Sequence, residues 1–70
     1  MDKREERILE RLRMQKMFIE TAREANLVWS RNAQDDGIRS QHLEIADFLA
    51  FAAKQYIRLI EGYRGEASTG

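Results

Sequence analysis

The chain of 70 residues has no cysteine and no proline, and it has only one histidine and four glycines. Without cysteine it forms no disulfide and offers no thiolate to a metal, and a single histidine argues against a zinc site. Because every glycine lies at position 37 or later, nothing interrupts a helix over the first half of the chain. We therefore expect an all-α protein with no cofactor and no metal.

Net charge and long apolar runs are also missing. Lys and Arg together number 12, as do Asp and Glu, so no net field would hold the protein on nucleic acid or on an anionic membrane. No run approaches the ~20 consecutive apolar residues of a membrane span, and the first residues carry alternating charges instead of an apolar signal region. We expect a soluble, cytoplasmic protein that does not bind membranes.

An apolar pattern with alternating spacings of four and three residues organises residues 38–63. Its members are Ile38, His42, Ile45, Leu49, Ala52, Tyr56, Leu59 and Tyr63. A repeat averaging about 3.5 residues follows one side of a helix that packs lengthwise on other helices. Ala46, Ala53 and Ile60 flank the pattern on one side and Phe48 on the other, which widens the apolar sector to about 180°.

Another helix, which precedes this one in the chain, is predicted from residue 3 to about residue 35. Its apolar sector, about 160° wide at 100° per residue, contains Ile8, Leu12, Met14, Phe18, Ile19, Ala22, Ala25, Trp29 and Ala33. Arg11, Gln15 and Asn26 project into the same sector. Because a buried amide without a partner costs about 1 to 3 kcal/mol, we expect Asn26 to pair across an interface and set its specificity, while Arg11 and Gln15 extend to water.

The helix boundaries follow from the glycines. Gly37 is expected to take the left-handed conformation that ends the first helix, and Ser40 to cap a second helix of about 41–63. Residues 1–64 then form a helical hairpin, and residues 65–70 form a disordered tail.

Two helices alone enclose no interior, so both wide sectors predict a homodimer of hairpins in a four-helix bundle. The residues expected in the core or dimer seam are Ile19, Ala22, Asn26, Trp29, Ile45, Leu49, Ala52, Tyr56, Leu59 and Tyr63.

The sequence contains no catalytic motif. His42 lies two residues from Ser40 and has no identifiable third group to orient it, so nucleophilic catalysis has no support. A histidine within an apolar repeat is more often a hydrogen-bonded structural residue. We expect a protein that is not an enzyme.

Several apolar residues lie outside both predicted sectors, next to charged positions. A lone exposed aromatic is normal on any surface, but an apolar patch with a charged rim is typical of a protein-binding site. The residues predicted to bind a protein partner are Phe51, Phe48, Leu43, Arg58 and Asp47 on the second helix, and Met17 and Val28 on the first.

Three resemblances suggest functions. The segment Ser40-Gln41-His42-Leu43-Glu44 is similar to the Ser-Gln-x-Leu-Asp signature of small two-helix aspartyl-phosphate phosphatases of sporulation signalling, although Glu44 stands where that family has Asp. In length and plan the chain resembles the plasmid Rop proteins, which are RNA-binding dimers of hairpins. Here the early basic residues scatter around the predicted helix and acids interrupt them, which makes a nucleic-acid partner the weaker alternative.

The third resemblance is to small phage-encoded anti-activators, two-helix proteins that dimerise and bind host transcription regulators, including those of quorum sensing. It covers the whole chain in outline and carries no shared motif. It implies a small dimeric inhibitor that binds another protein, and this is the function that the sequence favours over an RNA- or DNA-binding bundle or a phosphatase.

Overall fold

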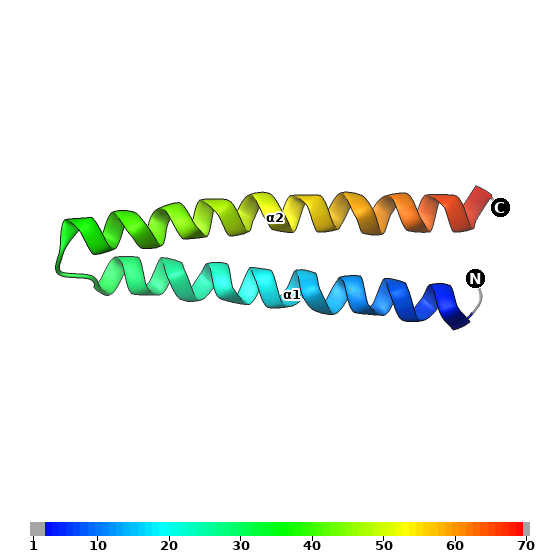
Figure 1. The fold of residues 1–70 in the computed structure, drawn as a ribbon, viewed down its shortest axis with the longest axis horizontal. Helices are drawn as coiled ribbons and strands as arrows, with labels where there is room; N and C mark the ends of the chain where they lie inside the picture. The colour runs from blue at the N-terminus through cyan, green and yellow to red at the C-terminus, as the bar shows by residue number, and fades with distance from the viewer. Residues whose placement is uncertain (1–2, 70) are drawn as a thin grey trace.

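Two antiparallel helices form a hairpin 53 Å long and 16 Å wide, measured over its Cα atoms. The computed structural model describes the backbone of residues 3–69 and the side chains of residues 3–63. Helix α1 spans Lys3–Asn32 and α2 spans Asp36–Thr69. The helices lie side by side along their whole length, with both chain ends at one end of the hairpin and the connection at the other (Figure 1). The predicted all-α hairpin is confirmed.

Asp35 caps the start of α2. Its Oδ1 accepts hydrogen bonds from the backbone N–H groups of Gly37 and Ile38 at 2.7 and 3.1 Å, which are the groups left unpaired in the first turn of a helix. The backbone N–H of Arg39 donates to the carbonyl of Asp35 at 3.0 Å and begins the regular helical ladder. Arg39 also closes α1, because its Nη2 donates to the carbonyl of Ala33 at 2.8 Å.

These contacts correct the prediction for the turn. No described residue has a positive φ, glycines included, so Gly37 does not take the left-handed conformation that we expected. It lies inside the first turn of α2, and Ser40 lies further inside the same helix. Asp35 outcompetes Ser40 as the cap because its carboxylate reaches two N–H groups. In consequence α1 ends at Asn32 instead of near residue 35, and α2 begins at Asp36 instead of near residue 41.

The helical backbone of α2 continues to Thr69, across most of the segment predicted to be a disordered tail at 65–70; Gly70 lies outside the described residues. A glycine inside a helix costs roughly 1 kcal/mol relative to alanine. Gly62 and Gly65 therefore weaken this end of α2 without imposing a stop.

Buried or half-buried side chains recur at the alternating spacing on each helix and mark the contact between α1 and α2. We call these positions the hairpin seam. On α1 they are Glu5, Leu9, Leu12, Lys16, Ile19, Arg23, Asn26 and Ser30, followed by Ala33 just after the helix, and on α2 they are His42, Ala46, Leu49, Ala53, Tyr56, Ile60 and Tyr63. Only Leu9, Ala46, Ala53 and Ile60 among the described apolar residues are fully buried, and no large side chain is completely enclosed.

The hairpin seam and the apolar repeat found in the sequence lie on overlapping but different sides of α2. They share His42, Leu49, Tyr56 and Tyr63, but the buried residues between these are Ala46, Ala53 and Ile60. The other half of the sequence repeat, Ile38, Ile45, Ala52 and Leu59, lies beside the contact, and all but Ala52 are exposed. Small residues at 46 and 53 let α1 approach this side of α2 closely, which leaves the larger side chains free.

Candidate functional site

A polar cluster lies within the hairpin seam near the connection. The Asn26 side-chain N–H donates to the carbonyl of Ala22 at 2.8 Å, so its Oδ1 is the atom that lies 2.9 Å from Nδ1 of His42. An amide oxygen only accepts, and His42 therefore carries a proton on Nδ1 and donates it. Asn26 does pair across an interface, as predicted, and that interface lies between α1 and α2.

Two neighbours complete the cluster. The indole ring of Trp29 lies against the imidazole of His42 with ring centroids 5.5 Å apart and planes tilted by 53°. The hydroxyl of Ser30, which is buried, donates to the carbonyl of Arg39 at 3.3 Å. The cluster thus fixes the register of the helices, and none of its groups is a nucleophile paired with a base.

One broad apolar face runs along the hairpin beside this seam. We define the broad apolar face by Ile8, Phe18, Ala22 and Trp29 of α1 and Ile38, Ile45, Phe48, Ala52 and Leu59 of α2. Most of them come one position before a residue of the hairpin seam, which rotates them by about 100° from it. Because α1 and α2 run in opposite directions, the same rotation places both sets on the same side of the hairpin. Phe18 is 77% exposed and Phe48 is 68% exposed.

The opposite side of the hairpin carries a shallow charged groove. It is lined by Arg13, Lys16, Met17 and Glu20 of α1 and by Ile57, Ile60 and Glu61 of α2. Most of these residues come one position after a residue of the hairpin seam, and those from α1 and α2 meet in one groove. Residues one position before the seam are rotated in the opposite sense, so those from both helices meet on the other side, where we place the broad apolar face. Lys16 and Glu20 form an ion pair at 3.4 Å along its α1 edge.

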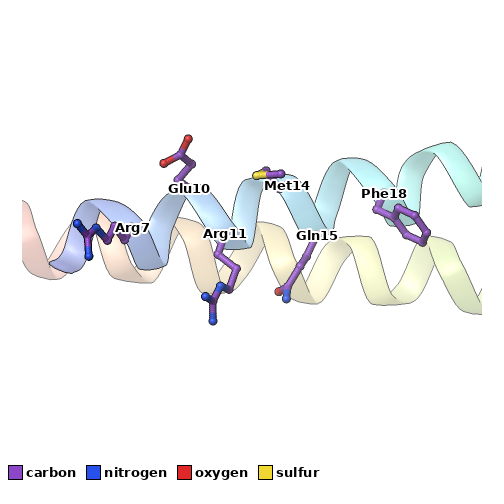
Figure 2. Close-up of a pocket in the computed structure, with 6 residues that line it drawn as sticks. All are labelled: Arg7, Glu10, Arg11, Met14, Gln15 and Phe18. Carbon is purple, nitrogen blue, oxygen red and sulfur yellow. The ribbon is translucent and has the colours of Figure 1, made fainter. Parts of the chain in front are cut away.

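Basic side chains gather at the open end of α1. Lys3, Arg4, Arg7 and Arg11 line one depression together with Ile8. The adjoining depression is lined by Arg7, Glu10, Arg11, Met14, Gln15 and Phe18, all of which project from α1 (Figure 2). From the sequence we expected the early basic residues to scatter around the helix. Four of them share one side of the helix, and Arg13 and Lys16 lie in the charged groove instead.

The residues predicted to bind a partner are all exposed but do not form one patch. Phe48 belongs to the broad apolar face, while Phe51, Asp47 and Arg58 lie on the outer side of α2, away from α1. Leu43 lies on the side of the charged groove. On α1, Met17 lies in the charged groove and Val28 faces outward.

The residues predicted for the core or dimer seam fall into two groups. Ile19, Asn26, Leu49, Tyr56 and Tyr63 lie in the hairpin seam, whereas Ala22, Trp29, Ile45, Ala52 and Leu59 belong to the broad apolar face. Sequence reasoning missed Asp35 as a cap and Ile57 as a lining residue of the charged groove. Ile57 could have been found from its position directly after Tyr56, because residues one position after the hairpin seam line this groove.

The segment 40–44 shows no assembled catalytic group. Ser40, Gln41, Leu43 and Glu44 are exposed on α2, and His42 is engaged by Asn26. No group of three or more potential ligands that could hold a metal ion occurs among the described residues. Within that part of the chain, neither helix has both the length and the apolar character needed to cross a membrane.

Comparison of the chain with known protein families, with curated proteins and with solved structures found no match.

Proposed function

We propose that the protein is a homodimer in which two hairpins join through their broad apolar faces to form a four-helix bundle. The observation that carries this proposal is the exposed surface. The hairpin exposes 5756 Å², whereas a folded monomer of this mass exposes about 4,500 Å². The long, thin hairpin has a high ratio of surface to volume. Much of its exposed apolar surface, including Phe18, Trp29 and Phe48, lies on the broad apolar face, which a second hairpin covers.

The dimensions of the hairpin fit this partner. At 53 Å by 16 Å, one side of the hairpin offers on the order of 800 Å², which is the area that each partner contributes to a stable interface. Ala22 and Ala52 lie among larger residues on the broad apolar face, so the side chains of a second copy have recesses to enter.

The dimer acts by binding another protein and catalyses no reaction. The support comes from the large apolar residues that remain exposed outside the broad apolar face, which include Phe51, Leu43 and Met17. Phe51 and the nearby Arg58 on the outer side of α2 provide an aromatic anchor beside a charge, the combination found at the centres of protein interfaces. Inhibition of a transcription regulator in the cytoplasm is the activity proposed from the resemblance to phage-encoded anti-activators.

Site-specific photocrosslinking tests the binding function. A photoreactive phenylalanine analogue is placed at position 51 in the native host, and the same analogue at Gln34 in the connection serves as control. We expect a discrete crosslinked protein from position 51, and binding of that purified protein should weaken by about 2 kcal/mol or more when Phe51 is replaced by Ala. Equal binding by the Phe51→Ala variant and the unaltered chain would contradict a role for this surface.

A second candidate function is supported by the depression lined by Lys3, Arg4, Arg7 and Arg11. Four cations on one side of a helix end form a larger positive footprint than the balanced net charge suggests, and they suit phosphate groups of RNA or DNA. Binding of this kind loses affinity steeply with rising salt concentration. A complex with nucleic acid that shows a steep salt slope, which Arg4→Gln and Arg7→Gln reduce and Arg13→Gln does not, would favour this candidate over protein binding.

A further inference from the structure

The hairpin is electrically polarised along its length. The open half, residues 3–18 and 51–63, carries eight basic and four acidic residues, a net charge of +4. The half next to the connection, residues 19–50, carries three basic and six acidic residues, a net charge of −3. The balanced charge of the whole chain thus hides two regions of opposite sign.

Two symmetric arrangements join a pair of hairpins through the broad apolar face. If the two-fold axis runs along the hairpin, both connections lie at the same end and each half faces its own like-charged copy. If the axis runs across the hairpin, the connections lie at opposite ends and the positive half of each copy faces the negative half of the other. Both arrangements keep neighbouring helices antiparallel and cover the same apolar residues, so apolar burial does not choose between them.

We infer that the second copy docks with its connection at the opposite end, because only this arrangement pairs the oppositely charged halves. The inference rests on the dimer proposed above and adds its orientation. Electrostatic complementarity fixes register and excludes the like-charged alternative. Lys3 and Arg4 of one copy then lie near Asp35 and Asp36 of the other, at both ends of the bundle.

The same orientation places the middle of each hairpin at the two-fold axis. Phe18 lies near the midpoint of α1, Lys3–Asn32, so the two copies of Phe18 approach each other there. Phe48 and Ala52 lie near the corresponding level of α2 and meet Ala52 and Phe48 of the second copy. An aromatic opposite an alanine packs without a clash, which suits this pairing of α2 with its own copy.

Distances between spin labels test the orientation directly, because the chain has no cysteine and a single introduced thiol labels one site. Gln34→Cys places the label in the connection, and Thr21→Cys places it near the middle of α1; both positions are exposed. With connections at opposite ends, the labels at position 34 are separated by about the 53 Å length of the hairpin. With connections at the same end, they lie within roughly 25 Å, the width of two packed helix layers.

The label at Thr21 is the control for association. It lies close to its copy, within roughly 35 Å, in either arrangement. A long distance at Gln34 with a short one at Thr21 supports the inference. Short distances at both positions would overturn the orientation and leave the dimer standing. No dipolar coupling at Thr21 would mean that the chain does not dimerise, and both proposals would fall.

Salt dependence provides a second test that does not rely on labels. Attraction between opposite halves is screened as salt rises, and the dimer should dissociate about threefold or more readily at 0.2 M salt than at 0.02 M, where the Debye length is longer. Tighter association at 0.2 M salt would indicate like-charged halves in contact and would overturn the inference.

Discussion

Asn26 and His42 join α1 to α2 through a hydrogen bond of 2.9 Å that lies in the hairpin seam. The side-chain N–H of Asn26 is already committed to the carbonyl of Ala22, so the bond fixes both the orientation of the amide and the tautomer of the imidazole. A hydrogen-bonded pair between the two helices is satisfied in one alignment of the helices only. It therefore specifies the register of the helices more than it adds stability.

A double-mutant cycle on this pair should show coupling. Asn26→Ala removes the acceptor of the His42 Nδ1–H and should cost about 1 kcal/mol or more, because His42 is only partly able to reach water. The double variant with His42→Ala should be less destabilised than the sum of the single variants, with an interaction energy above about 0.5 kcal/mol. Urea unfolding of the four proteins gives this quantity, and additive effects would mean that the bond carries no energy.

Asp35 should prove to be the cap of α2. Asp35→Ala removes the acceptor of two backbone N–H groups and should lower the free energy of unfolding by about 1 kcal/mol. Asp36→Ala is the matched control, because Asp36 carries the same charge but makes only an exposed ion pair with Arg39 at 3.6 Å. Thermal melts should show a clear loss for the first variant and little change for the second. Equal losses would indicate a general effect of acidic charge.

Gly37 should tolerate alanine. Its φ is not positive, so alanine fits the backbone and should stabilise the helix through its higher helix propensity. The added Cβ would lie 3.0 Å from Oδ1 of Asp35, and this crowding of the cap offsets that gain. We expect Gly37→Ala to change stability by less than about 1 kcal/mol. Gly62→Ala is the comparison, because nothing lies within 4 Å of its added Cβ. If Gly37→Ala alone lowered the free energy of unfolding by more than about 1 kcal/mol, Gly37 would have the left-handed conformation that the sequence suggested.

Phe18 and Phe51 should behave differently although both are exposed in the hairpin. Phe18 belongs to the broad apolar face, and Phe18→Ala should weaken the dimer by about 2 kcal/mol or more. Phe51 lies on the outer side of α2, and Phe51→Ala should leave the dimer constant unchanged. Dilution calorimetry measures both constants. A stronger effect of Phe51 would place the interface between copies on the outer side of α2.

The sequence was sufficient to predict two long helices, because the chain has no proline and its apolar residues recur at helical spacing. It also showed that each helix carries more apolar surface than one neighbour covers. It did not show which part of each sector forms the hairpin seam. Ile45 and Ala46 are adjacent and both apolar, so periodicity alone cannot tell which one faces α1; the small side chain of Ala46 permits the closer approach and is buried.

The turn and the candidate site were harder to predict for physical reasons. Asp35, Gly37 and Ser40 each suit a helix boundary, and their competition is decided by which oxygen reaches the free N–H groups. Asn26 was identified as an interface residue because a buried amide needs a partner, but the identity of that partner depended on the alignment of the helices. The clustering of Lys3, Arg4, Arg7 and Arg11 was missed because acidic residues interrupt them in sequence, although none of these acids lines the depression that the four basic residues share.

Sedimentation equilibrium at micromolar concentration shows whether the hairpin forms a dimer in solution. We predict a single species of twice the 8.2 kDa chain mass, and a midpoint of thermal unfolding that rises with protein concentration, as expected when folding and association are linked. A monomer of 8.2 kDa that unfolds cooperatively at a temperature independent of concentration would show that the hairpin is stable in water with its broad apolar face uncovered, and would rule out the proposed dimer.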